Sequence, residues 1–406
     1  STDKLMTQVA KELNVDGVIE GSIAREGDQV RISVQLIDGS TDGHIWSQEY
    51  RRASTSILGL QSEVARAVAD ALRLQLTTQE AAHFSHAPTI DPAAHDAYLR
   101  GRCYWNEGAR ENLPKSLEFF ELALKQDPSY APAYAGIADY YSALPFFGNL
   151  QPDAVFPKAR EAVAKALELD DSLAEAHGTL AYILAYYDWN WKEAGVEFET
   201  SLRLNPNDAT QRHRYSRYLA SLGRVEDSLR ELERARLLDP LDSLIRANVG
   251  IIHYFARQYD QTIEDLQNLL RDQPDFSTAH WGLGLAYEQK GAYDRARVEF
   301  EAASARRSIN SLAPLGHLYG MMGQKAKADE ILAELSKRAS TENVSGYHTA
   351  LVHLGLRQTR PALEALEQAY RERSTLLSYL KMDPRLDPLR RDPKFEALLS
   401  RVGLGP

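Results

Sequence analysis

The chain has 406 residues and carries 47 lysines and arginines against 57 aspartates and glutamates, a formal net charge of −10. This acidic balance disfavours a phosphate-binding surface over the whole molecule, although a local basic patch is compatible with it. The single cysteine, Cys103, excludes an internal disulfide framework; we interpret it as a buried small apolar residue, with a bridge between two molecules as the alternative.

The sequence has no apolar run of about 18 residues and no leader in which basic residues precede an apolar stretch. We therefore expect neither a membrane span nor a signal peptide within the residues shown. The opening STDKLMTQVA lacks an initiator methionine and enters a helical pattern at once, which indicates a longer parent protein.

Residues 1–80 predict a small α/β block. Residues 4–13 have the pattern of a short amphipathic helix. Three strand-like runs follow, joined by turn-rich connections of hairpin length, at residues 18–24, 30–37 and 44–50.

The second of these runs alternates apolar and polar residues, with Val30, Ile32 and Val34 on one side. Such a strand has one buried face and one solvated face. A helical pattern over residues 56–76 should cover the buried face of the sheet.

This block resembles the second half of the TolB amino-terminal-like (FlgO-like) domain, which precedes helical repeat arrays in bacterial signalling proteins. The resemblance rests on ELNVDGVIEGSI, RISVQLID and HIWSQEY, followed by a helix that contains LQSEVA. In that family an additional strand and helix come first, and both are missing here. Either the sequence begins inside the domain, or an open sheet edge is completed by a second copy, which predicts a homodimer.

Residues 81–94 form a polar linker with two histidines, His83 and His86. Their spacing of three can place both imidazoles on one helix face for a metal ion. No cluster of Cys, Asp or Glu completes such a site nearby. We therefore expect no metal and no cofactor.

A sparse pattern returns every 34 residues between residues 208 and 308. It includes small residues at Ser216, Gly250 and Gly284, apolar residues at Leu232, Leu266 and Phe300, and prolines at Pro206, Pro240 and Pro274. A period of 34 residues predicts stacked helical hairpins. The small Gly284 would let its partner helix approach closely, and the prolines should end each second helix.

This pattern resembles the tetratricopeptide repeat (TPR), and it continues less regularly over residues 95–373. Within it, the YYDWNW stretch at residues 186–191 should pack against an insertion at residues 144–157; a second ligand site is the alternative. The sequence predicts a mainly α fold, a right-handed TPR α-solenoid of about eight helical hairpins preceded by the small α/β block.

Residues 374–406 differ in composition, because three Asp-Pro pairs separate short helical turns. A solenoid needs its terminal apolar face covered, so we interpret this segment as a cap, with a binding tail as the alternative. The ending resembles the close of the TPR array in bacterial serine/threonine kinases, cyclases and winged-helix (CadC-like) regulators.

No catalytic motif is present: the sequence lacks His-Glu-x-x-His, Gly-x-Ser-x-Gly, a phosphate-binding glycine loop and a kinase catalytic loop. We therefore expect a protein that is not an enzyme. The alternative is an active site at the junction of the α/β block and the array, near residues 40–105.

In TPR arrays the first helices of the hairpins line a concave groove, and the resemblance places eleven residues of this chain there. Aromatic and arginine side chains are the types most enriched at binding hot spots. For Tyr182 and Tyr254 the alternative is that the rings only thicken the core. The groove candidates are Tyr98, Arg102, Trp105, Asp139, Tyr182, Tyr186, His213, Arg217, Tyr254, Trp281 and Glu288.

The sequence therefore predicts a protein- or peptide-binding scaffold, the sensory or interaction region of a bacterial signalling or transcription-regulatory protein, without direct nucleic-acid binding. A free-standing scaffold that dimerises through the α/β block is the alternative. We expect a soluble chain, cytoplasmic or, if the parent carries an upstream membrane span, periplasmic.

Overall fold

The computed structural model describes residues 6–13, 15–26, 29–53, 63–64, 67–71, 91–106, 112–146, 150–303 and 309–405. The chain divides into two compact units. One comprises residues 1–101 and 121–130, and the other comprises residues 102–120 and 131–406.

The first unit contains the predicted three-stranded sheet. Helix α1 (Met6–Leu13) precedes strands β1 (Gly17–Glu26), β2 (Gln29–Asp38) and β3 (His44–Ala53). The strands are antiparallel in the order β1-β2-β3, so β1 and β3 are both edge strands. The three predicted strands are confirmed, and each extends beyond the run that the alternation marked.

One face of this sheet is the dry face that the sequence predicts. Val30, Ile32 and Val34 of β2 are buried together with Tyr50 of β3. The described residues of the predicted 56–76 helix, including Val64, Ala67 and Val68, pack against this cluster. The predicted covering of the dry face is confirmed for these residues.

Helices α4 (Pro92–Asn106) and α5 (Leu113–Gln126) form the first helical hairpin. The prediction that Cys103 is buried is wrong, because its side chain is exposed. The buried residues of α4 are Ala94, Ala97, Tyr98 and Gly101, at the three- and four-residue spacing of one helix face. Cys103 lies two residues beyond Gly101 and falls outside that stripe.

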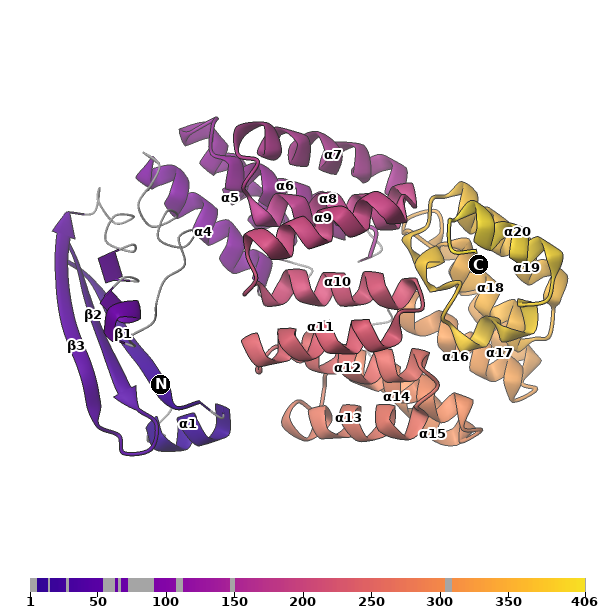
Figure 1. Ribbon diagram of the computed structural model, residues 1–406. Helices are drawn as coiled ribbons and strands as arrows, with labels where there is room; N and C mark the ends of the chain where they lie inside the picture. The colour runs from indigo at the N-terminus through magenta and orange to yellow at the C-terminus, as the bar shows by residue number, and fades with distance from the viewer. Residues whose placement is uncertain are drawn as a thin grey trace. The chain divides into compact units, whose positions relative to one another are not determined.

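The described residues of the second unit contain seven helix pairs from α6 to α19, and the predicted α-solenoid is confirmed (Figure 1). The pairs are α6 (Ala131–Ala143) with α7 (Pro152–Leu169), α8 (Ala174–Ile183) with α9 (Trp191–Leu204), α10 (Ala209–Ser221) with α11 (Val225–Leu238), α12 (Ser243–Phe255) with α13 (Tyr259–Asp272), α14 (Ser277–Gln289) with α15 (Tyr293–Ala303), α16 (Ile309–Met321) with α17 (Lys325–Arg338), and α18 (Gly346–Gly355) with α19 (Thr359–Arg371).

The repeated positions form the core, as their period predicts. Leu232, Leu266 and Phe300 are fully buried on successive second helices. A side chain added at Gly284 would overlap the ring of Phe300, so the predicted close approach is confirmed. Helices α11 and α13 end two residues before Pro240 and Pro274, where proline forces the preceding residue out of the helical conformation.

The YYDWNW stretch divides its aromatic rings between two neighbours. Tyr187 stacks on Phe156 of α7 with ring centroids 4.6 Å apart, and its hydroxyl donates to Asp153 at 2.8 Å. The predicted packing against the insertion is therefore confirmed for this ring. Trp189, in contrast, stacks on Tyr370 of α19.

The last segment consists of two short 3-10 helices, η3 (Thr375–Tyr379) and η4 (Pro384–Leu389), and helix α20 (Pro393–Arg401). Its leucines and Phe395 are buried in one core with residues of α8, α9, α18 and α19. The indole nitrogen of Trp191 donates to the carbonyl oxygen of Val402 at 2.7 Å. The end of the array thus packs against its third hairpin (Figure 1).

Candidate peptide-binding face

The eleven predicted groove residues lie on the first helices of their hairpins or at their ends, and we call this surface the first-helix face. In the second unit it comprises the end of α4 from residue 102, with α6, α8, α10, α12, α14, α16 and α18, whereas Tyr98 belongs to the first unit. The predicted residues fall into two groups by exposure. Tyr98, Asp139, Tyr186, His213, Tyr254 and Glu288 are buried, whereas Arg102, Trp105, Tyr182, Arg217 and Trp281 are partly exposed.

Asp139 on α6 is the centre of a polar cluster that joins successive first helices. Its carboxylate accepts a hydrogen bond from Thr179 Oγ1 at 2.6 Å and one from Arg214 Nη1 at 2.9 Å. Arg102 Nη1 lies 3.6 Å from the other carboxylate oxygen. Sequence reasoning missed Thr179 and Arg214, which lie 35 residues apart at equivalent places of α8 and α10.

A second acidic side chain, Glu175, lies near this cluster. Burial raises the pKa of its carboxyl, and the guanidinium of Arg102 only partly opposes that rise. Between the end of α4 and α10, the helices of the first-helix face carry three arginines of this stretch, Arg102, Arg214 and Arg217, against two carboxylates, Asp139 and Glu175.

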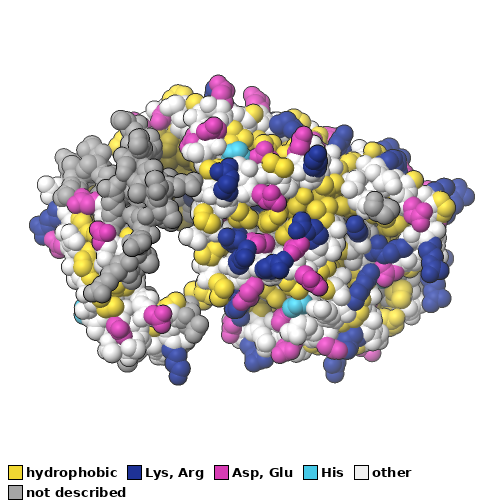
Figure 2. All heavy atoms as spheres, viewed as in Figure 1, with side chains coloured by type: hydrophobic (Ala, Val, Ile, Leu, Met, Phe, Trp, Pro, Cys, Tyr) yellow, Lys and Arg dark blue, Asp and Glu magenta, His cyan; other side chains and the backbone are white. Residues whose placement is uncertain are grey.

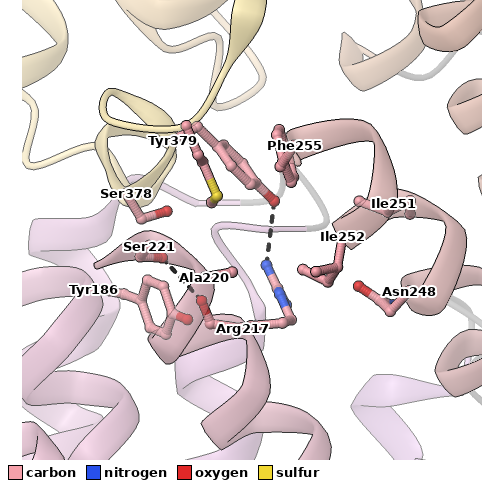
Figure 3. Close-up of a pocket in the computed structure, with 11 residues that line it drawn as sticks. Tyr186, Arg217, Ala220, Ser221, Asn248, Ile251, Ile252, Phe255, Ser378 and Tyr379 are labelled. Carbon is pink, nitrogen blue, oxygen red and sulfur yellow. Dashed lines mark hydrogen bonds between the residues drawn. The ribbon is translucent and has the colours of Figure 1, made fainter. Parts of the chain in front are cut away.

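Arg217 on α10 differs from the other arginines of this face because its contacts are aromatic. Its Nη2 donates to the hydroxyl of Tyr379 at 3.3 Å, and its guanidinium carbon lies 6.0 Å from the ring centroid of Tyr186 (Figure 3). Within the described residues no carboxylate lies within 4 Å of its nitrogens. Burial raises the pKa of the Tyr186 hydroxyl, so that ring is neutral at physiological pH.

A cavity of about 20 Å³ lies beside Arg217, between α10, α12 and η3 (Figure 3). Asn248, Phe255 and Met382 are among its lining residues. This volume admits about one water molecule and excludes a peptide side chain. The histidine on the same helix, His213, is also enclosed, and burial together with Arg217 lowers its pKa to about 3.

From α12 onward, the first-helix face is filled by the last segment of the chain. Tyr379 of η3 stacks on Phe255 of α12 with centroids 5.5 Å apart, and Met382 is buried in the core around α12 and α14. Asp383 accepts a hydrogen bond from the hydroxyl of Tyr347 at 2.6 Å. The same carboxylate pairs with Arg385 on both oxygens.

The filled region explains the burial of Tyr254, and the neighbouring helix α16 accounts for a contact of the buried Glu288. Tyr254 is fully enclosed, and burial, with the nearby Asp383 charge, raises the pKa of its hydroxyl well above the usual value. Its position corresponds to the alternative in which the ring thickens the core. Glu288 lies 3.1 Å from Nδ1 of His317 on α16, and both side chains are buried.

The stretch of the first-helix face that stays accessible runs from the end of α4 to α10. It presents Arg102 and Trp105 of α4, Tyr134 of α6, Tyr182 of α8 and Arg217 of α10, all partly exposed. Trp281 of α14 is partly exposed further along the array, and its buried indole nitrogen has no hydrogen-bond partner among the described residues. That these residues contact a peptide stays a prediction.

The described residues show neither a metal-binding cluster nor a helix that could span a membrane. They contain no group of three or more His, Cys, Asp or Glu side chains arranged to hold a metal ion, and His83 and His86 lie outside them. In the same residues, no helix combines the length and the apolar character needed to cross a membrane.

Comparison with known proteins identifies the repeat. Residues 248–311 match the family described as tetratricopeptide repeat. A human structure, the IFIT1 dimer with PPP-AAAA, aligns with a TM-score of 0.52 at 15% identity and covers 78% of each chain. This likeness shows the fold alone. The array is a TPR-type α-solenoid.

Curated relatives include bacterial proteins of larger size. A protein of Rhizobium meliloti (strain 1021), provisionally named adenylate cyclase 3, is 32% identical over 182 residues, which are 44% of this chain and 31% of that protein. The transcriptional regulator HilA of Salmonella typhimurium is 26% identical over 168 residues, 41% of this chain and 30% of HilA. The chain thus matches less than a third of the length of each relative.

Proposed function

We propose that this chain is a non-enzymatic protein-binding scaffold, the interaction region of a bacterial signalling or transcription-regulatory protein. The two bacterial relatives are named as a cyclase and a transcriptional regulator, which supports a signalling context. On the face seen in Figure 2, basic and acidic side chains are mixed over α9 to α12 without one extended basic region. Such a surface supports protein partners over nucleic acid.

The observation that carries the proposal is the division of the first-helix face. From α12 onward it holds a segment of the chain itself, in which Tyr379 meets Arg217 and Phe255. From the end of α4 to α8 it keeps partly exposed arginine and aromatic side chains without such a segment in the described residues, and Arg217 of α10 lies at the boundary between the two parts. This accessible stretch suits a peptide that combines acidic and aromatic residues.

The proposal predicts selective binding of an acidic peptide. A labelled synthetic peptide of glutamate and phenylalanine should bind, and its lysine counterpart should not, because Arg102, Arg214 and Arg217 outnumber the two carboxylates of the stretch. Trp105→Ala and Arg217→Ala should each weaken binding roughly tenfold, about 1.4 kcal/mol. Fluorescence anisotropy measures the affinities.

Arg360→Ala is the matched control, because Arg360 is an exposed arginine paired with Glu364 on α19, away from the first-helix face. This variant should bind as the unmodified chain does. Equal affinity for the acidic and basic peptides, or equal affinity in the Trp105 and Arg217 variants, would remove the proposal. Circular dichroism of each variant checks that the array is intact.

A second candidate function, homodimerisation through the sheet, is favoured by the apolar surface of β1. Ile19 and Ile23 are 51% and 73% exposed. They lie opposite Leu36 and Ile32 in the antiparallel register, and therefore on the dry face of the sheet. Within the described residues, no strand pairs with the outer edge of β1. A second copy could pair with this edge and cover both isoleucines.

Dimerisation through β1 predicts a change of mass in solution. The chain should be a dimer by light scattering, and Ile19→Lys with Ile23→Lys should make it monomeric, because two charges would be buried unpaired in the interface. Ile45→Lys is the control: Ile45 is 55% exposed on β3, the strand at the other edge of the described sheet. A monomeric unmodified chain at high concentration would rule out this candidate.

A further inference from the structure

The turn between α11 and α12 exposes four leucines within eight residues. Leu237 is 69% exposed, Leu238 41%, Leu241 68% and Leu244 45%. Leu237 and Leu238 end α11, Leu241 lies in the turn, and Leu244 lies in the first turn of α12. We call these four residues the leucine patch. Contiguous exposed apolar surface of this kind marks interaction sites.

The repeat itself shows that the fold does not require these leucines. Thirty-four residues before and after Leu237, the array has Arg203 and Arg271. The same step from Leu241 and from Leu244 reaches polar residues in both neighbouring hairpins: Asn207, Asp275, Thr210 and Thr278. The buried positions of these three hairpins are equivalent, and three positions that are polar in both neighbouring hairpins are leucine in this one.

The charges around the leucine patch are predominantly negative. Its turn contains Asp239 and Asp242, and the turns on either side contain Asp208 and Asp275. None of these carboxylates has an ion pair among the described residues. The cations at the equivalent helix ends are Arg203 and Arg271, and the other nearby arginines are paired, Arg236 with Glu233 and Arg246 with Asp272.

The backbone at this turn is already satisfied. Asp242 accepts hydrogen bonds from the amides of Leu244 at 2.7 Å and Ile245 at 2.9 Å, and so caps α12. The turn offers no strand edge for an extended peptide to pair with. A partner must therefore bind through side chains, which an amphipathic helix presents at three- and four-residue spacing.

We propose that the leucine patch is a docking surface for an amphipathic helix of a partner protein, with apolar residues on one side and lysine or arginine beside them. The leucines provide apolar contact, and the surrounding aspartates attract the basic residues. This surface is distinct from the first-helix face between α4 and α10, which has the opposite charge preference.

The test uses the full chain and two synthetic helical peptides, one of leucine and lysine and one of leucine and glutamate. The leucine–lysine peptide should bind and the leucine–glutamate peptide should not. The combined variant Leu237→Arg, Leu241→Asn, Leu244→Thr installs the residues found in the preceding hairpin, and it should bind the basic peptide at least tenfold more weakly. Because the array already uses these residues, its melting temperature should not fall.

Two further variants keep the test decisive. Val298→Arg adds the same charge at another exposed apolar residue, on α15, and should bind normally. Asp239→Asn with Asp275→Asn keeps all four leucines. This variant should bind the leucine–lysine peptide more weakly, and its binding should depend less on salt concentration. Equal binding by the combined variant, or no binding by the unmodified chain, would overturn the proposal. If the unmodified chain is a dimer and the combined variant is a monomer, the leucine patch binds a second copy of this chain, and the proposed partner helix is wrong.

Discussion

Asp383→Ala should lower the free energy of unfolding by about 3–5 kcal/mol, because it leaves the charge of Arg385 buried without its partner. The two side chains are almost completely enclosed, at 1% and 4% exposure, and Arg385 Nη2 lies 2.7 Å from Asp383 Oδ2. The hydroxyl of Tyr347 would lose its acceptor as well. Urea denaturation followed by circular dichroism measures the change.

The same segment supplies a matched control. Asp387 of η4 pairs with Arg257 at 2.8 Å and with Arg390 at 2.7 Å, and all three side chains are between 29% and 48% exposed. Asp387→Ala should therefore cost less than about 1 kcal/mol, because water replaces the lost partner. If the two substitutions had equal effects, the buried pair would not hold the last segment on the first-helix face.

The pH dependence of this pair has a defined sign. Burial alone would raise the pKa of Asp383, but the charge and hydrogen bonds of Arg385, with the hydroxyl of Tyr347, hold it below the usual value. A lowered folded-state pKa stabilises the fold above the unfolded value of about 3.9, and this contribution is lost as the pH falls. Below about pH 4 the unmodified chain should lose stability more steeply than Asp383→Asn.

The array could be predicted from the sequence because its contacts are local and periodic. Leu232, Leu266 and Phe300 mark the same place in three hairpins, and each is buried mainly by its own hairpin and the next. The alternation of apolar and polar residues around Ile32 likewise predicted which face of the sheet is buried. The likeness of the first block to a TolB-type domain stays a prediction.

The filling of the first-helix face could not be predicted, because it depends on contacts without a period. Tyr379 meets Arg217, 162 residues earlier in the chain, and Arg257 meets Asp387, 130 residues later. Tyr379 and Asp387 belong to the last segment, outside the 34-residue repeat, so spacing alone could not show that Tyr254 would be enclosed. Asp139 was found from its place on a first helix, but its contact with Arg214 again spans different hairpins.

The contact between α16 and α18 depends on two glycines, Gly320 and Gly355, where the helices meet backbone to backbone. A Cβ atom at Gly355 would overlap the carbonyl oxygen of His317 and lie 2.7 Å from its Cα. One at Gly320 would overlap the backbone of Gly355 itself. Backbone atoms cannot rotate away as a side chain can, so the helices must separate to admit even one methyl group.

Gly355→Ala should therefore destabilise the chain by about 3 kcal/mol, the upper end of the usual range for overpacking. A loss of stability would be informative in itself, because alanine otherwise stabilises a helix relative to glycine by about 1 kcal/mol. Gly323→Ala is the control: its added methyl would meet no atom within 4 Å, and only its φ of +73° opposes the change.

Gly323→Ala should lower the free energy of unfolding by about 1 kcal/mol, because alanine is strained in a left-handed conformation. Thermal melting of the three chains measures both effects. A Gly355→Ala chain that melts with or above the unmodified one would contradict the close approach of α16 and α18. In this structure α18 contacts the backbone of His317 at Gly355, and the side chain of His317 faces Glu288. Without the close approach of α18, this placement of His317 would also be wrong.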